Sequence, residues 1–395
     1  MTEAVLAGIR VLDFTRYVSG PYATMLLADA GAEVIKVEPP GGEVTRTLPP
    51  LLKTEEGEIS TYFLRLNRGK KSVTLDARSA EDRPVLEELI RSADVLVENF
   101  RPGTLESWGL GWERLQQLNP RLVYASISGF GHSDSPCRDW PAFNLVAEAM
   151  AGVVSQLPTP EKRPRAAGLP FGDTVASLHA VNGIVMALLR RTRTGRGSRV
   201  DIAMYDAMLS MNEWSIAVQS GAGVEVDLGT DVHPWFAPYG LFEASDGWLC
   251  ICVATDPHWQ AFCRVAGWDD LAVDPRLQRG LDRAANFHDL IEPRLREWLA
   301  TLTAREAAVR LAEAGVPAAP LQRPADLLED EQARARDMII DAPATAGTSI
   351  KLAGNPVRIE PRPAAHATGF SEPGQHNEEI LAGLRPFPDD VSASA

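Results

Sequence analysis

Short apolar runs alternate with helical patterns through the first third of the chain. β-branched and apolar residues predict five strands, at 8–15, 33–40, 71–76, 94–100 and 121–131. Between them, composition and end signals predict helices at 22–32, 77–93 and 112–119. This alternation is typical of a parallel sheet with helices on both faces, so we expect an α/β fold.

The pattern changes near residue 141. Long apolar helices are predicted over 143–156 and 174–191, and a strand that runs into a helix over 199–218. A hairpin over 238–254, turning at Ser245–Gly247, is followed by amphipathic helices. A chain of 395 residues favours two domains. We therefore predict a large α/β domain in 1–225, a smaller α+β middle domain in 226–335 and a C-terminal segment, 336–395, that returns to the large domain.

Charge and cysteine content narrow the class of protein. The formal net charge of −14 argues against a nucleic-acid partner, although local cations can still hold an anionic ligand. The four cysteines form no CxxC pair and are interpreted as small core residues of a reduced protein. No leader-like segment and no membrane-spanning stretch is expected, so a cytoplasmic protein with no membrane partner is predicted.

Several common sites are missing from the sequence. There is no GxxxxGK[ST] motif, and GPYATML follows the first predicted strand where a dinucleotide-binding protein has GxGxxG. The sequence has no HExxH or GxSxG motif, and its seven histidines show no ligand spacing. Neither a resident metal nor an NAD-linked dehydrogenase is therefore favoured.

Seven segments together resemble one enzyme family. In chain order they are 11–42, 67–76, 97–131, 141–153, 172–209, 233–248 and 372–384. They resemble the class III coenzyme A transferases, which include formyl-CoA transferase, carnitine CoA-transferase and α-methylacyl-CoA racemase. The resemblance implies a Rossmann-like large domain, a small middle domain reached by two linkers, and an interlocked homodimer. It also implies that the partners are an acyl-CoA and a carboxylic acid, with coenzyme A as part of the substrate and no metal.

The residue that matches the family's nucleophile is Asp173, in GDTVASLHAVNG. The resemblance implies that its carboxylate attacks the donor thioester to give a mixed anhydride, and that an aspartyl-CoA thioester follows. The local sequence is compatible with this role, because a helix starting at Thr174 would place Asp173 at its N-cap, where the anion is favoured. The local pattern alone favours a helix cap without a catalytic role for Asp173, and it is the family pattern that favours the nucleophile.

The resemblance also suggests residues that bind coenzyme A. It implies that Val18 and Ser19 lie along the pantetheine arm and that Leu75 to Arg78 lie near the adenosine phosphates, with Arg78 as the cation. Further expected contacts are Asn99, Phe100, Arg101 and Phe143. Weaker candidates are Lys36, Arg68, Lys70 and Lys71. Candidate aromatic residues of the acyl pocket are Tyr17, Trp140, Phe143, Trp235 and Phe236.

Departures from the family pattern bear on the substrate. Formyl-CoA transferase has a glutamine where Val18 stands, an arginine where Ser107 stands, and a glycine run where this chain has GTDVHPWFAPYG (229–240). We therefore predict an acyl group that is bulkier or less polar than formyl.

Two alternatives remain open. A racemase of the same family uses a histidine where this chain has Phe143, and a phenyl ring carries no proton, so this alternative is disfavoured. The nearest histidines in sequence are His132 and His179, and His179 is expected to be packed in the core. A non-catalytic acyl-CoA-binding protein is the other alternative, against which the presence of Asp173 argues.

Overall fold

The computed structural model describes residues 4–55, 57–157, 163–225, 233–345, 347–360 and 369–382. The chain forms two compact units. The first contains 1–153, 168–213 and 331–395, and the second contains 154–167 and 214–330. The predicted boundary at 225/226 borders residues 226–232, which lie outside the described part of the chain.

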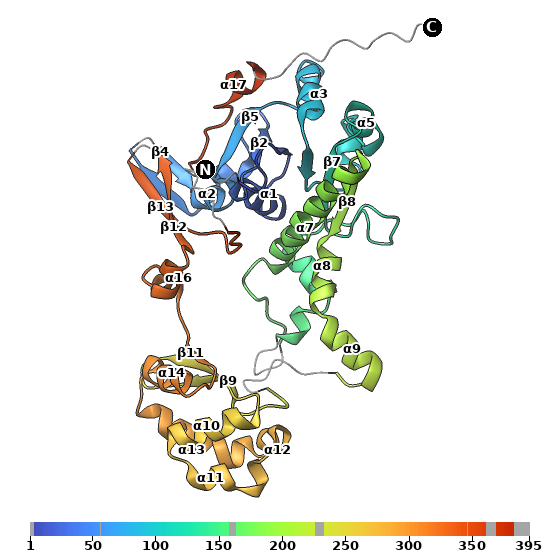
Figure 1. Ribbon diagram of the computed structural model, residues 1–395. Coiled ribbons are helices and arrows are strands. Elements are labelled where there is room, and N and C mark those ends of the chain that lie inside the picture. Colours follow the sequence, from blue (N-terminus) through green and yellow to red (C-terminus); the bar gives the residue numbers. More distant parts are fainter. Residues whose placement is uncertain are drawn as a thin grey trace. The chain divides into compact units, whose positions relative to one another are not determined.

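A six-stranded sheet forms the centre of the first unit (Figure 1). Its strand order is β5-β2-β1-β6-β7-β8 and every neighbouring pair is parallel. The strands are β1 Arg10–Asp13, β2 Glu33–Glu38, β5 Lys70–Thr74, β6 Val95–Glu98, β7 Val123–Ser128 and β8 Ser198–Ala203. The α/β prediction and the strands expected from the apolar runs are confirmed.

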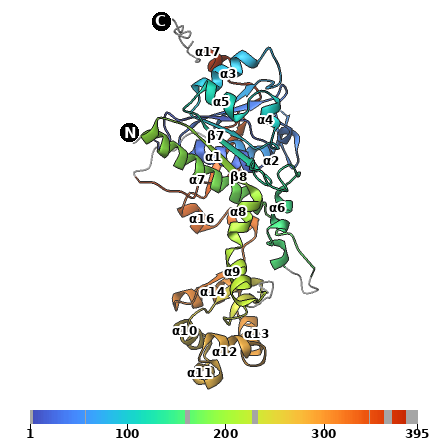
Figure 2. The same ribbon diagram turned by 90° about the vertical axis from the view of Figure 1, so that its right-hand side faces the viewer.

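Helices cover both faces of this sheet (Figure 2). On one face α3 (Arg83–Ser92), α4 (Thr104–Ser107) and α5 (Trp112–Leu118) bury leucines against the strands. On the other face α1 (Ser19–Asp29) and α7 (Phe171–Thr194) do so. The short helices α6 (Asn144–Met150) and α8 (Met204–Met211) pack against α7. The remaining elements of this unit are η1 Val44–Thr47, β3 Leu51–Thr54, β4 Gly57–Ser60, α2 Thr61–Asn67, α16 Glu331–Ala335, β12 Ile339–Thr345, β13 Thr348–Ala353 and α17 Asn377–Ala382.

The strand order creates a switch point between β1 and β6. Successive connections run outward in opposite directions from these two central strands, so their carboxyl ends open a crevice. Ligands of doubly wound sheets bind at this place. The loop after Asp13 and the loop after Glu98 therefore border the expected site.

Helix α7 is longer than predicted. Its 24 residues are long and apolar enough to span a membrane by length and composition, and α7 is the one such helix among the described residues, which corrects the expectation of none. In this fold one face of α7 packs on the sheet, because Gly183 allows a close approach to Val200: a Cβ at Gly183 would lie 2.6 Å from Val200 Cγ1. Arg191 fixes its C-terminal end through a 2.8 Å ion pair with Asp94.

The C-terminal segment covers the edge of the sheet at β5. Ser371 Oγ donates to Lys70 O at 2.6 Å, His376 Nδ1 accepts from Ser72 N at 3.2 Å, and Asn377 Oδ1 accepts from Thr74 N at 3.0 Å. These contacts pair backbone groups that an edge strand would leave open. Residues 361–368 and 383–395 of the predicted tail lie outside the described residues.

The second unit combines a three-stranded antiparallel sheet with helices. Strands β9 (Tyr239–Glu243) and β10 (Trp248–Cys252) form the predicted hairpin, and β11 (Ala318–Pro320) pairs with β10. Trp259 and Phe262 lie at the centre of its apolar core. Its helices are α9 Glu213–Ala222, α10 Asp256–Ala266, α11 Asp269–Val273, α12 Gly280–Ala285, α13 Glu292–Ala300, α14 Ala304–Glu313 and α15 Pro324–Leu327.

Candidate active site

Asp173 lies in the first turn of α7 but does not cap it. The helix begins at Phe171 after Pro170, and no side chain caps it, so the expected N-cap role of Asp173 is wrong. Its carboxylate instead accepts hydrogen bonds from the backbone N–H and the hydroxyl of Ser19. Ser19 is the first residue of α1, where backbone N–H groups lack intrahelical partners. The negative charge of Asp173 therefore lies at the N-terminus of α1 as well as in the first turn of α7. The dipoles of both helices favour an anion there.

Burial is the main influence on the charge of Asp173. It raises the pKa of this carboxyl to about 6. The hydrogen bonds from Ser19 and the charge of Arg65 oppose the rise, and the charge of Glu148 adds to it. At neutral pH the group is therefore mostly ionised, yet it is more basic than an ordinary aspartate, which suits a nucleophile.

The raised pKa predicts an acid limb in the rate. If ionised Asp173 is required, kcat/KM falls tenfold per pH unit below about pH 6 and is level above it. Initial rates between pH 4.5 and 8 check this, in a buffer series of constant ionic strength and with a stable acyl-CoA donor. If the rate instead began to fall only near pH 4, the pKa range of an unperturbed carboxyl, the effect of burial on Asp173 would be contradicted.

Asn99 holds the loop that carries Ser19. It follows β6 and spans the switch point, where its Oδ1 accepts from Arg16 N at 2.8 Å and its Nδ2 donates to Arg16 O at 2.7 Å. The same Nδ2 lies 3.1 Å from Ser19 Oγ. Tyr17, which lies between Arg16 and Ser19 in the loop, has a φ of 63°, which is rare for a residue with a side chain. The amide of Asn99 thus stabilises a strained loop and orients the hydroxyl that binds Asp173.

Ser177 joins the loop to α7 from the other side. Its Oγ lies 2.5 Å from Ser19 O and 2.6 Å from Asp173 O. Asn144 and Glu148 of α6 contact the start of α7, where Asp173 N donates to Asn144 Oδ1 at 3.2 Å and Gly172 N donates to Glu148 Oε1 at 3.3 Å. Helices α1, α6 and α7 therefore fix Asp173 together.

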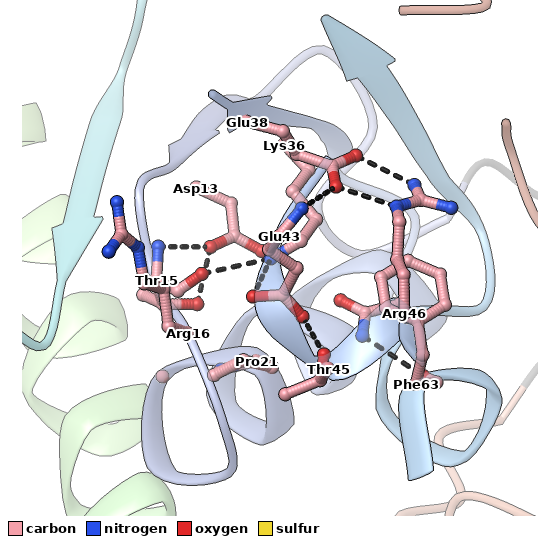
Figure 3. A network of polar contacts seen from close by, with 12 residues as sticks. Asp13, Thr15, Arg16, Pro21, Lys36, Glu38, Glu43, Thr45, Arg46 and Phe63 are labelled. Carbon is pink, nitrogen blue, oxygen red and sulfur yellow. Dashed lines mark hydrogen bonds and ion pairs between the residues drawn. The ribbon is translucent and has the colours of Figure 1, made fainter. Parts of the chain in front are cut away.

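A buried charge network lies beneath the same loop (Figure 3). Asp13, at the end of β1, accepts from Thr15 N at 2.8 Å and from Thr24 Oγ1 at 2.7 Å, and it forms a 2.9 Å ion pair with Lys70. Lys36 Nζ donates to Thr15 O at 2.9 Å and lies 3.4 Å from Glu43 Oε2. These groups connect strands β1, β2 and β5 to the loop that leads to Ser19.

The two cations of this network, Lys36 and Lys70, set the pKa of Asp13. Burial raises the pKa of Asp13, but the ammonium groups of Lys36 and Lys70 outweigh burial and hold it well below its usual range. Burial and the charge of Lys36 lower the pKa of Lys70 to about 8. Asp13 therefore stays ionised at neutral pH, and its ion pair with Lys70 weakens as the pH rises through about 8.

The structure removes most of the weaker cationic candidates from the surface. Lys36 and Lys70 belong to the buried network, and Arg68 is buried against Asp29 with a 2.6 Å ion pair. Lys71 contacts Glu33 and Glu379 at 2.9 and 2.6 Å. Each of these four charges is neutralised by carboxylates of the same chain.

The expected coenzyme A contacts fall into two groups. Val18, Ser19, Asn99 and Asp173 meet at the switch point, and Phe143 joins them because its ring packs edge-on against Tyr17, 5.9 Å away. Phe100 follows Asn99 and lies under the guanidinium of Arg16, 5.1 Å from its ring. Leu75 and Arg78 follow β5 instead, and no described contact joins them to Asp173. Arg78 pairs with Asp76 at 3.0 Å on the surface, and Arg101 is exposed.

Sequence reasoning did not identify five residues around Asp173. Ser177 could have been found, because it lies four positions after Asp173 and so on the same face of α7. The positions of Asn144 and Glu148 depend on the packing of α6 on α7. Tyr62 and Arg65 of α2, whose electrostatic influence reaches Asp173, lie more than a hundred positions away in sequence and gave no signal.

Comparison with known proteins decides the family. The sequence profile described as CoA-transferase family III matches residues 6–377. The chain belongs to CoA-transferase family III. It is 38% identical to the succinyl-CoA:mesaconate CoA-transferase of Haloarcula hispanica, over 95% of each chain. It is 35% identical to the formyl-CoA:oxalate CoA-transferase of Streptomyces coelicolor, over 97% of this chain and 96% of that one.

Solved structures agree with this membership. A CAIB/BAIF family protein from Brucella suis superposes with a TM-score of 0.87 and 32% identity, covering 97% of this chain and 100% of that one. The protein is thus an enzyme of the CoA-transferase type, and enzymes of this type use CoA thioesters as substrates. The resemblance seen in the sequence is confirmed.

The two histidines nearest to Asp173 in the sequence, His132 and His179, do not contact it. His179 lies on the exposed side of α7, so the expectation that it is packed in the core is wrong. The His132 ring is buried 3.6 Å from Glu98, and burial lowers its pKa. Within the described residues no histidine contacts Asp173, and Phe143 stands beside the loop of Ser19. Within the same residues no three His, Cys, Asp or Glu side chains are grouped as metal ligands.

Proposed function

We propose that this CoA-transferase works through covalent intermediates on Asp173. One oxygen of the Asp173 carboxylate attacks the thioester carbonyl carbon of the donor, the C–S bond breaks, and CoA leaves as its thiolate. The thiolate then attacks the aspartyl carbonyl of the mixed anhydride, which releases the donor acid as a carboxylate and leaves an aspartyl-CoA thioester. The acceptor carboxylate attacks the aspartyl carbonyl of this thioester and expels the thiolate, which gives a second mixed anhydride. The thiolate then attacks the acceptor's carbonyl carbon, which forms the new acyl-CoA and releases the Asp173 carboxylate. Each step exchanges one anion for another, so no proton is transferred.

The placement of Asp173 is the observation that carries this proposal. A carboxylate is a weak nucleophile, and it becomes effective when it is desolvated and oriented. Here burial raises its pKa, while Ser19 binds it at the N-terminus of α1. The buried carboxylate of Asp13, by contrast, is ion-paired with Lys70, and its pKa is lowered.

A second donor at the same helix end is available for the oxyanion. Pro21 has no N–H, and Tyr22 N already donates to Val18 O at 2.9 Å. The N–H of Gly20 has no described partner, and we assign it to the thioester oxygen as it becomes negative. Only glycine fits there, because a Cβ would lie 2.2 Å from the side chain of Thr15.

We also propose that the enzyme acts as a homodimer, interlocked as the resemblance implies. The face of α7 that turns away from the sheet exposes Leu178, Val185, Met186 and Leu189, and α6 exposes Leu145 and Met150. An apolar area of this extent on a water-soluble enzyme favours a protein interface, and a second copy is the occupant that the family suggests. Light scattering after gel filtration should give twice the chain mass of 42.9 kDa, and a monomer at micromolar concentration would contradict it.

A transfer screen tests the function. The purified enzyme is incubated with succinyl-CoA, acetyl-CoA or formyl-CoA and with a panel of acids, and new acyl-CoA products are identified by mass spectrometry. The relatives carry different carboxylates in their names, including mesaconate, oxalate and glutarate, so the panel must be broad. Transfer without net hydrolysis is expected. Uptake of deuterium at C2 of a 2-methylacyl-CoA would favour the racemase, and binding without turnover would favour the acyl-CoA-binding protein.

A further inference from the structure

The helix α2 carries a cation that the fold leaves without a carboxylate. Four cations, Arg65, Arg68, Lys70 and Lys71, follow one another in 65–71, and the last three are ion-paired. Arg65 forms no ion pair with any described residue, and its Nε is buried without a hydrogen-bond partner. A buried donor without an acceptor is unfavourable, because it has lost its hydrogen bond to water. A guanidinium kept in this state suits an anion that arrives from outside the chain.

The surroundings of Arg65 fix its orientation. Its guanidinium carbon lies 4.4 Å from the centre of the Tyr62 ring, three residues earlier on α2. The group lies against the ring and interacts with the Tyr62 hydroxyl, while its buried Nε keeps a donor without an acceptor among the described residues. Ser60 fixes the start of α2 by accepting from Phe63 N, and α2 packs against α1, the helix that begins at Ser19. The position of Arg65 is therefore set by ordered elements.

Arg65 and Tyr62 lie within electrostatic range of the nucleophile. The positive charge of Arg65 lowers the pKa of Asp173, and the negative charge of Asp173 contributes to raising that of Tyr62. Both side chains are described, yet no ion pair joins Arg65 to Asp173. The two charges therefore interact without a direct ion pair, and the helices that carry them, α2 and α7, both pack against α1.

The chemistry of the reaction limits what this anion can be. The phosphates of coenzyme A lie at the opposite end of the molecule from the sulfur, so a cation beside Asp173 does not hold them while the thioester reacts. The carboxylate of the acceptor acid that reacts must stay nucleophilic, because it attacks the aspartyl carbonyl carbon at Asp173. A second carboxylate, a few carbon atoms away on the same acid, would meet the guanidinium with matched bidentate geometry.

We propose that Arg65, which lies against Tyr62, binds the distal carboxylate of a dicarboxylic acid and so makes the enzyme selective for dicarboxylic over monocarboxylic acids. The proposal rests on the proposed function, because it assumes that the acid reacts at Asp173. It makes Arg65 a specificity-determining residue rather than a part of the covalent chemistry.

Matched acids test the proposal. With one acyl-CoA donor, kcat/KM is measured for succinate against butyrate and for glutarate against pentanoate, which differ only in the distal carboxylate. The wild type is expected to prefer each dicarboxylate by roughly 10- to 100-fold, the range of one charge-assisted hydrogen-bonded pair. Arg65→Met should abolish this preference by raising KM for the dicarboxylates, with butyrate and pentanoate changed by less than about threefold. Arg65→Lys should restore part of it.

Arg114→Met is the control, since Arg114 is an exposed arginine of the same unit that pairs with Glu87 at 2.9 Å, and it should leave every rate unchanged. An equal loss for both kinds of acid in Arg65→Met would overturn the proposal and assign Arg65 to the orientation of Asp173. A wild type without preference would also overturn it. In both cases transfer to butyrate would show that the proposed function stands, whereas the absence of transfer to any acid would count against the function itself.

Discussion

Asp173→Asn is expected to abolish CoA transfer and at the same time to stabilise the folded protein. Loss of the nucleophile should lower kcat by roughly 10⁴-fold or more, as removal of other essential catalytic groups does. The amide oxygen can still accept from Ser19, so the site keeps its geometry. Steady-state transfer and the unfolding free energy in denaturant measure the two effects.

The gain in stability follows from the raised pKa. Asp173 has a pKa of about 6 in the folded protein and an ordinary value near 3.8 when unfolded. Above pH 6 the folded state therefore carries the cost of a desolvated charge, at most about 3 kcal/mol. Below pH 3.8 the carboxyl is protonated in both states and the cost vanishes. The advantage of Asp173→Asn should thus be absent in acid and grow between pH 3.8 and pH 6.

Two further variants make this result specific. Asp173→Ala should be equally inactive but should lack most of the gain, because the N–H of Ser19 loses its acceptor. Asp206→Asn replaces another first-turn aspartate whose pKa burial raises, and it should retain activity. An Asp173→Asn variant that is inactive but less stable at pH 7 than the wild type would show that the carboxylate mainly holds the fold together.

Lys70→Met is expected to give the largest loss of stability. It removes the ammonium group that pairs with Asp13 at 2.9 Å and that also donates to Pro21 O and Asn67 Oδ1. A buried carboxylate left with one of its two cations typically costs about 3–5 kcal/mol. Because Asp13 and Lys70 support the loop before Ser19, activity should fall as well. Denaturant unfolding followed by circular dichroism gives the free energy.

The adjacent lysine provides the control for this variant. Lys71 is half-buried and contacts Glu33 and Glu379 at the edge of the sheet, so Lys71→Met should cost less than about 1 kcal/mol. The double variant Asp13→Asn/Lys70→Met should recover part of the stability, since no unpaired charge is left. Equal losses for Lys70→Met and Lys71→Met would mean that the network contributes little to the fold.

The sequence allowed the sheet to be predicted because buried parallel strands are continuous apolar runs. Asp173 emerged through the family pattern, but its environment did not. The start of α7 was misplaced because Gly168–Gly172 contains two glycines and a proline that look like a loop. His179 was misjudged because α7 is apolar on most sides, and nothing local says which side meets the sheet.

Long-range packing explains what could not be predicted. Ser19 and Asp173 meet because α1 and α7 pack side by side on one face of the sheet. The lysines of β5 look like surface charges in the sequence, yet Lys70 points inward to Asp13 and Lys71 outward. Arg65 gave no signal at all, since its relation to Asp173 exists only once α2 packs on α1.

The covalent role of Asp173 can be observed directly. The enzyme is mixed with an acyl-CoA donor without acceptor, quenched in acid, and studied by intact-protein and peptide mass spectrometry, with hydroxylamine or borohydride treatment in parallel. We predict an adduct of one CoA less one water, located on the peptide that contains Asp173 and absent from Asp173→Asn. An adduct on another carboxylate such as Glu148, or turnover in the Asp173→Asn variant, would contradict the account.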